Sequence, residues 1–433
     1  MIRVKITTSN IIFFQIYFNI ILKFLTVDLR MPSAISYFPD MVTLLLMCCL
    51  LSKNRKINRI EQKVLLILFL FFIEGALSAL FNGVSPVLFL WSVRNQMRFY
   101  IWIFIVIFLF DCSKIDKLFQ GLNRLAIINL LIMIFQYLFF NLRGDYLNGV
   151  FGSYAGGNSA LNTFCVILTI ENVAALLIGK RKVKKVAIAI LSMCIMCAMN
   201  ELKFYYIELV IVIIFFIAFF MQRKIQKKTW KRLIFISVSG LLLAIIGYKA
   251  LVYFYPGFYN FFEKEVFLDY VTRSYNSSTV LYINGIPVSN RFTAYNIVIK
   301  YFLNSTTKLL FGIGMGASEY STYFSSAFHK KYGDIAISGY QLPQVLLENG
   351  IIGLCIFVFF YLFIYKIMNT EYKRIITTKR YLFMISGITA VIGLFICVYN
   401  SALRIETSGY LYYTMIALGM CRKMGDKYDS NED

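Results

Sequence analysis

Apolar segments of helix length recur along almost the whole chain, and they limit the folds that it can adopt. A helix needs about 17 to 25 mainly apolar residues to cross a bilayer. We therefore predict an all-α polytopic membrane protein with about twelve transmembrane helices. The predicted segments are residues 10–26, 35–51, 64–81, 96–112, 120–140, 159–179, 185–200, 203–221, 232–254, 343–366, 380–398 and 402–420. The pair from 185 to 221 also fits one kinked passage around Asn200 to Lys203.

The composition supports the same class of protein. Hydrophobic residues make up 59% of the chain, aromatic residues 17% and charged residues only 15%, and a soluble globule of this size could not bury so many apolar side chains. The chain has 44 Lys and Arg against 22 Asp and Glu, a net charge of +22. In a soluble protein this excess would suggest a nucleic-acid partner. Because the cations lie between the apolar segments, we attribute them to membrane topology and expect no nucleic acid.

The gaps between the predicted helices alternate in their content of Lys and Arg. One rich gap holds Lys180, Arg181, Lys182, Lys184 and Lys185, whereas the five short gaps of the opposite phase hold one or two cations each: Arg30; Arg94 and Arg98; Arg143; Lys203; Arg404. Rich gaps are retained on the cytoplasmic side of a membrane. We therefore predict that both termini are cytoplasmic and that residues 1–433 form a single integral membrane domain.

Residues 255–342 form one long gap, and its phase predicts that it is a large extracytoplasmic loop. Its aromatic and β-branched residues are typical of a folded segment rather than a disordered linker. Asn284-Gly285 between apolar flanks predicts a hairpin. In the stretch 295–304, Ile297, Val298, Tyr301 and Phe302 share one helical face, which favours a helix lying at the membrane interface.

Charged residues from distant parts of the sequence are predicted to meet at the outer ends of the helices. They are Arg94, Arg98, Arg143, Arg291, Glu348, Arg404 and Glu406. Guanidinium groups grip phosphate oxygens through two parallel donors, so such a ring suits a lipid-linked diphosphate. The alternative is that these arginines pair with the glutamates or with lipid headgroups.

Other residues are candidates for chemistry on weaker grounds. Glu74, Glu171 and Glu208 fall inside predicted helices, where a carboxylate marks either a partner or a proton pathway. His329 is either a base or a solvated loop residue. No group of His, Cys, Asp and Glu has metal-ligand spacing, so we expect no metal site. The glycine turn at Phe311–Gly316 does not match a P-loop, so nucleotide binding is not favoured.

Four motifs together carry a family resemblance. They are GVFGSYAGGNSALN at Gly149–Asn162, SNRFTAYN at Ser289–Asn296, FGIGMG at Phe311–Gly316 and QVLLENGIIG at Gln344–Gly353. From about residue 90 to 420 the chain resembles the bacterial O-antigen and capsular polysaccharide polymerases, called Wzy, and the related O-antigen ligases. The resemblance implies a class C glycosyltransferase-like fold in the bacterial cytoplasmic (inner) membrane and an activity without metal or other cofactor.

That resemblance implies transfer of a growing glycan from undecaprenyl diphosphate to the acceptor sugar of another lipid-linked repeat unit, at the outer face of the membrane. The implied partners are the undecaprenyl-diphosphate-linked oligosaccharide, membrane lipids and a chain-length regulator. A lipid-linked oligosaccharide flippase or transporter is the alternative from another class. It would also be basic and polytopic, but we see neither paired similar halves nor paired broken helices.

Three residues match the family motifs directly. Arg291 takes the place of the family's loop arginine, Glu348 that of its glutamate before the Gly-Ile-Ile-Gly turn, and Asn158 that of the asparagine after a glycine turn. Ligases usually carry a histidine shortly before this glutamate, where the present chain has Ser338-Gly339-Tyr340, so a polymerase is favoured over a ligase. We predict that Arg291 and Glu348 are catalytic. The predicted substrate-binding residues are Arg94, Arg98, Arg143, Asn158 and Arg404.

Overall fold

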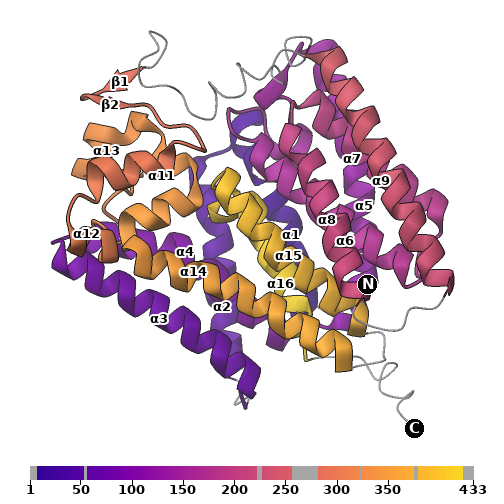
Figure 1. The fold of residues 1–433 in the computed structure, drawn as a ribbon, viewed down its shortest axis with the longest axis horizontal. Helices are drawn as coiled ribbons and strands as arrows, with labels where there is room; N and C mark the ends of the chain where they lie inside the picture. The colour runs from indigo at the N-terminus through magenta and orange to yellow at the C-terminus, as the bar shows by residue number, and fades with distance from the viewer. Residues whose placement is uncertain are drawn as a thin grey trace, which may run out of the picture.

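In the computed structural model the chain is an all-α bundle that carries a small unit with a two-stranded hairpin, which we call the extramembrane unit after its predicted position (Figure 1). The structure describes residues 7–52, 56–221, 227–255, 281–321, 323–374 and 379–422. The helices of the bundle are α1 (Thr8–Lys23), α2 (Phe38–Leu51), α3 (Arg59–Phe81), α4 (Pro86–Leu109), α5 (Ile115–Phe139), α6 (Asn158–Leu177), α7 (Val183–Met199), α8 (Lys203–Met221), α9 (Lys227–Phe254), α14 (Gln341–Arg374), α15 (Lys379–Tyr399) and α16 (Glu406–Leu418). The extramembrane unit contains β1 (Tyr282–Ile283), β2 (Ile286–Pro287), α11 (Ala294–Ile297), α12 (Thr306–Phe311) and α13 (Ala327–Tyr332).

Each of the predicted apolar segments overlaps one helix of the bundle, and α7 and α8 are separate helices rather than one kinked passage. Among the described residues, seven helical segments are long and apolar enough to cross a membrane: Thr8–Asp28, Ser33–Leu51, Arg59–Phe81, Cys112–Phe139, Asn158–Leu177, Gln341–Arg374 and Lys379–Tyr399. The prediction for 96–112 was wrong at its start, because α4 already begins at Pro86. Proline is favoured in the first turn of a helix, and Arg94, which follows it on α4, pairs with Asp40 of α2.

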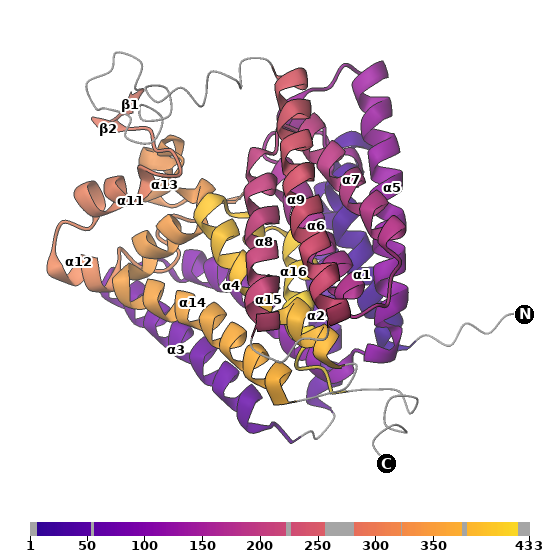
Figure 2. The ribbon, with the colours of Figure 1, turned by 45° about the vertical axis from the view of Figure 1, so that its right-hand side comes forward.

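The centre of the bundle is formed by α6, α15 and α16, with α6 enclosed on all sides (Figure 2). Outer helices instead leave large apolar side chains exposed, such as Leu66 on α3, Leu131 on α5 and Ile188 on α7. An apolar outer surface of this extent needs an apolar solvent. The arrangement therefore supports an integral membrane protein.

Hydrogen bonds define two ends of the bundle. At one end the Thr8 hydroxyl donates to the Leu109 carbonyl at 3.1 Å, and the Arg422 amide donates to the Ile107 carbonyl at 3.1 Å. At the other end the Ser153 amide donates to the Asp28 carboxylate at 3.0 Å. We call the second end, which carries the extramembrane unit, the loop end. The gaps rich and poor in Lys and Arg thus gather at opposite ends, and which end faces the cytoplasm stays a prediction.

The described part of the predicted extracytoplasmic loop 255–342 begins at residue 281, since residues 256–280 lie outside the described ranges. The hairpin prediction is confirmed: β1 and β2 pair antiparallel across Asn284-Gly285, whose φ angles are 51° and 76°. Two successive positive φ angles define the tight turn that suits a two-residue hairpin.

The helix predicted within 295–304 is present as α11 and a π-helical turn over Val298–Phe302. Its assignment to the membrane interface was wrong. Ile297, Val298 and Phe302 are buried in a small core together with Ile335 and Leu347. The apolar face is therefore covered by protein, and it fixes the extramembrane unit onto α14.

Candidate functional site

The glycine turn Phe311–Gly316 lies directly against a break in α14. Gly350, inside this helix, has φ 62° and ψ −163°, a conformation that interrupts the helix and that side chains other than hydrogen rarely tolerate. A Cβ atom on Gly350 would collide with the Leu310 carbonyl, and one on Gly312 with the Glu348 carbonyl. These glycines therefore allow two backbones to touch.

Three donors satisfy the carbonyl groups that the break exposes. The Ile313 amide donates to the Leu347 carbonyl at 2.9 Å, and the Gly314 amide donates to the Glu348 carbonyl at 3.0 Å. The Ser78 hydroxyl of α3 also reaches the Glu348 carbonyl at 3.1 Å. The last carbonyls of any helix need partners of this kind. The glycine turn thus ends the first half of α14 and holds Glu348 at that point.

Glu348 is fully buried, and its side chain bonds Ser318, two residues after the glycine turn. Its Oε1 accepts from the Ser318 amide at 3.0 Å and from the Ser318 hydroxyl at 2.7 Å. Gln344, one turn earlier on α14, donates to the same hydroxyl oxygen at 3.2 Å. Hydrogen bonds to a carboxylate are among the stronger ones in proteins, so this carboxyl is held in one orientation.

Glu319, next along the chain, joins the extramembrane unit to α16 and α4. It forms an ion pair with Arg404, and its Oε2 accepts from the Asn95 amide at 3.0 Å. Arg404 also interacts electrostatically with Glu348. The Ser318-Glu319 pair therefore lies between the predicted catalytic glutamate and a predicted phosphate-binding arginine.

The second part of this network is deeper in the bundle. Arg98, with a side chain 7% exposed, pairs with Glu406 at 2.5 Å and with Asp40 at 3.6 Å. It also donates to the Arg404 carbonyl at 3.0 Å. Arg94, one turn earlier on α4, donates through Nε to Asp40 at 2.9 Å. We call this set the outer network: Asp40, Arg94, Arg98, Ser318, Glu319, Glu348, Arg404 and Glu406.

Two expectations about the arginines change. Arg94 and Arg98 lie inside α4, not at or beyond its end, because the helix begins at Pro86. Arg98 and Arg404 are paired with glutamates and Arg94 with Asp40, which is the alternative left open by the sequence. Arg98, in particular, forms ion pairs with Glu406 and Asp40, so it joins α4 to α16 and α2.

A second group of predicted residues meets on the same end of the bundle. The Asn158 side-chain amide donates to Asp145, and Arg291 acts on Asp145 electrostatically. The Arg291 guanidinium lies 3.8 Å from the centre of the Tyr399 ring. Partial desolvation and the nearby Glu201 raise the pKa of Asp145, while Arg291 lowers it, with a net upward shift. Asp145 therefore links the glycine turn before α6 to the extramembrane unit.

Arg143 and His329 lie apart from these contacts. Arg143 is exposed, and its guanidinium covers the Tyr137 ring at 3.5 Å. His329 belongs to α13 and stacks on Tyr320 with ring centres 4.0 Å apart. Neither contact suggests a role in catalysis.

Sequence analysis missed Asp40, Ser318 and Glu319 as members of the site. Asp40 sits in the first turn of α2, where an acidic residue is common for helix electrostatics alone. Ser318 and Glu319 follow FGIGMG after one intervening residue, Ala317, and their position just after a predicted site motif was the available signal.

The partners of the intramembrane glutamates are also visible. Glu74 accepts a hydrogen bond from Asn349 at 2.9 Å, and Glu208 accepts one from Asn162 at 2.8 Å. Each bond joins side chains from different helices.

Comparison of the chain with models of known protein families gave no match, and a search of curated proteins gave none either. The function must therefore be argued from the site itself.

Proposed function

We propose that the protein is a polysaccharide polymerase that uses undecaprenyl-diphosphate-linked repeat units, at the outer face of the bacterial cytoplasmic membrane. One observation carries most of the argument: the extramembrane unit inserts Ser318-Glu319 between Glu348 of α14 and Arg404 before α16. Residues from opposite ends of the sequence thereby form one polar site where a membrane bundle meets a folded outer segment. A lipid-linked sugar offers its diphosphate and its glycan at that same level.

The proposed reaction breaks the bond between the anomeric carbon of the growing glycan and its diphosphate oxygen. A hydroxyl of the acceptor sugar forms the new bond, and its proton passes to Glu348. Arg291 stabilises the negative charge that develops on the departing diphosphate. The Arg291 guanidinium lies over the Tyr399 ring, 3.8 Å from the ring centre, and this contact orients the plane of the guanidinium.

Arg98 and Arg404 take a different role in this proposal from the one that the sequence suggested. Their ion pairs with Glu406 and Glu319 occupy them, so they act as positioning residues that keep Ser318 on Glu348. Arg94, with a side chain 25% exposed, is the arginine of the outer network with the most access to a ligand. We assign to it, with Arg143 and Asn158, the binding of the lipid diphosphate.

The decisive experiment is the glycan-length profile of a bacterial strain that lacks the protein. A polymerase predicts surface glycans of a single repeat unit, and plasmid-borne wild type restores long chains. Long polymer without any transfer to its final surface acceptor would instead identify a ligase. Lipid-linked units accumulating on the cytoplasmic side would identify a flippase, and an unchanged profile would remove the protein from glycan assembly.

Glu348→Gln tests the proposed base. The amide keeps the shape of the side chain but cannot accept the proton, so we expect loss of long-chain polymer by about 100-fold or more. The matched control is Glu371→Gln in the same helix, where Glu371 pairs with Arg374 near the far end. Polymer at wild-type level in Glu348→Gln, with normal protein in the membrane, contradicts the assignment.

Arg291→Lys tests bidentate contact with the diphosphate. Lysine keeps the charge but offers a point donor, so we expect about a 10- to 100-fold loss of polymer. Lys308→Arg, an exchange of the same kind on the exposed surface of α12, should change nothing. Wild-type levels of polymer with Arg291→Lys would place Arg291 outside the site.

One observation favours transport as the second candidate function. The break in α14 brings Asn349 onto Glu74 inside the bundle, and interrupted helices with buried carboxylates are typical of transporter sites. A transporter would move the lipid-linked oligosaccharide instead of joining it. The sidedness of accumulated lipid-linked units in the deletion strain separates the two functions.

A further inference from the structure

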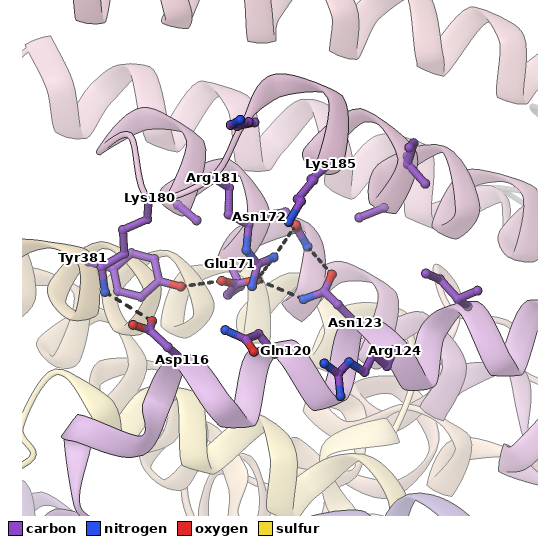
Figure 3. Close-up of a pocket in the computed structure, with 15 residues that line it drawn as sticks. Asp116, Gln120, Asn123, Arg124, Glu171, Asn172, Lys180, Arg181, Lys185 and Tyr381 are labelled. Carbon is purple, nitrogen blue, oxygen red and sulfur yellow. Dashed lines mark hydrogen bonds and ion pairs between the residues drawn. The ribbon is translucent and has the colours of Figure 1, made fainter.

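A pocket of about 810 Å³ lies at the end of the bundle opposite the outer network. Figure 3 shows the residues that line it. The pocket is bordered by the beginning of α5, the last turns of α6, the beginning of α7 and the first residues of α15. Neither the outer network nor the proposed reaction uses it. Its rim includes the gap from Lys180 to Lys185, whose cations predict a cytoplasmic position.

The Glu171 carboxylate forms the floor of the pocket, and it is paired with groups of the protein itself. Glu171 is 1% exposed, and it accepts from the Tyr381 hydroxyl at 2.5 Å and from the Asn123 amide at 3.3 Å. Arg181 pairs with it at 2.8 Å and also donates to Asn172 at 2.6 Å. Figure 3 shows these partners gathered around Glu171, so its carboxylate is paired within the protein.

The rim, in contrast, carries an excess of positive charge. Five cationic side chains line the pocket against two carboxylates: Arg124, Lys180, Arg181, Lys182 and Lys185 against Asp116 and Glu171. Lys180 pairs with Asp116 at 3.3 Å. Within the described part of the chain, Arg124, Lys182 and Lys185 form no ion pair. Three exposed cations therefore surround an open pocket without a carboxylate to balance them.

One side of the pocket is apolar and continues along the outer surface of the bundle. Ile127 of α5 and Ile188 of α7 both line the pocket and are 46% and 50% exposed. Further along the same helices Leu131 and Leu191 are 61% and 41% exposed. An anion-binding rim that opens onto a membrane-facing apolar surface matches a molecule with a charged head and a hydrocarbon chain.

We propose that this pocket binds the phosphate headgroup of an anionic phospholipid, whose acyl chains lie along α5 and α7. The headgroup phosphate contacts Arg124, Lys182 and Lys185, and the Glu171–Arg181 network forms the base on which the head rests. Cations near a membrane surface each contribute to the binding of anionic lipid, by a factor of about five. A free phosphate ion shares the head chemistry but gains nothing from the apolar side.

The test measures lipid retained by the purified full-length protein after exchange into vesicles of phosphatidylglycerol or phosphatidylcholine. We expect the wild type to retain phosphatidylglycerol at least about 10-fold better than phosphatidylcholine. The triple variant Arg124→Gln, Lys182→Gln, Lys185→Gln should lose that preference. A matched triple, Lys56→Gln, Arg59→Gln, Lys63→Gln, removes the same charge from exposed positions elsewhere at this end and should keep it.

Two further measurements complete the design. Ala189→Trp fills the pocket without changing its charge, so it should lower retention even if the triple variant proves unstable. Inorganic phosphate is added in competition with phosphatidylglycerol. Equal retention by wild type and both pocket variants overturns the proposal, and so does loss of the preference in the matched triple. Displacement of the lipid by millimolar phosphate would overturn the lipid as ligand and identify the site as one for a free anion.

Discussion

The two ends of the bundle carry two polar sites that differ in how their charges are balanced. At the loop end the outer network pairs each of its arginines with a buried or half-buried carboxylate. At the other end the Glu171 carboxylate pairs with Arg181 in the floor of the pocket, and three cations of the rim form no ion pair among the described residues.

This difference teaches that a count of arginines does not identify a phosphate site. Arg98 and Arg404 looked like phosphate ligands in the sequence, yet their charges are matched inside the protein. Lys182 and Lys185 looked like topology signals, yet they border a pocket. What matters is whether the opposite charge is supplied by the protein or left for a ligand.

Arg98→Met should give the largest change in stability. It leaves Glu406 and Asp40 without their shared buried partner, and such a loss costs about 3–5 kcal/mol. Thermal unfolding of the purified protein in detergent measures the effect. Arg124→Met at the open pocket is the matched control and should stay within about 0.5 kcal/mol.

A double variant sharpens the same comparison. Adding Glu406→Gln to Arg98→Met removes the stranded charge, so the two changes together should cost less than their sum. Strict additivity would show that Arg98 and Glu406 do not act as a pair. An equal loss of stability in Arg98→Met and Arg124→Met would contradict the distinction between the two sites.

Gly350→Ala should have the next largest effect. The substitution places a Cβ at positive φ and against the Leu310 carbonyl, which costs about 1–3 kcal/mol. Gly339→Ala is the control, because Gly339 has open space around it. We also expect faster proteolysis of the extramembrane unit in Gly350→Ala than in the control. Equal stability of the two variants would contradict the role given to the break.

Lys185→Gln should have the smallest effect on stability, within about 0.5 kcal/mol, because the side chain is exposed and has no ion pair among the described residues. Its effect should appear instead as an about five-fold loss of phosphatidylglycerol retention. Lys63→Gln, exposed in another basic gap, should leave retention unchanged. A marked fall in the unfolding temperature of Lys185→Gln would mean that the rim is structural.

The helices were predictable because bilayer-spanning segments are recognised in a sequence by their length and their apolar composition. The start of α4 was missed because Ser92, Arg94 and Gln96 break the apolar pattern, and the pairing of Arg94 with Asp40 is visible only in the structure. The hairpin was found because Asn284-Gly285 fixes its own turn locally. The interfacial helix was misplaced because an apolar face specifies burial but does not say what covers it.

The same limit applies to the site. From the sequence, Arg98 and Glu406 were predicted to lie at one level of the membrane, and in the structure they form an ion pair. The sequence could not reveal Asp40, because that partner lies far away in the chain and carries no motif. Pairing between distant segments is decided by packing, so the distinction between an available and an occupied arginine needs three dimensions.

The contact between the glycine turn and the broken helix also bears on how such a chain can vary. The bonds that join them run from backbone to backbone, from Ile313 and Gly314 to Leu347 and Glu348, so most side chains nearby can change without loosening them. An inserted or deleted residue between 311 and 318 would shift Ser318 away from Glu348. Natural variants should therefore preserve the length of this stretch more strictly than the identities of its residues.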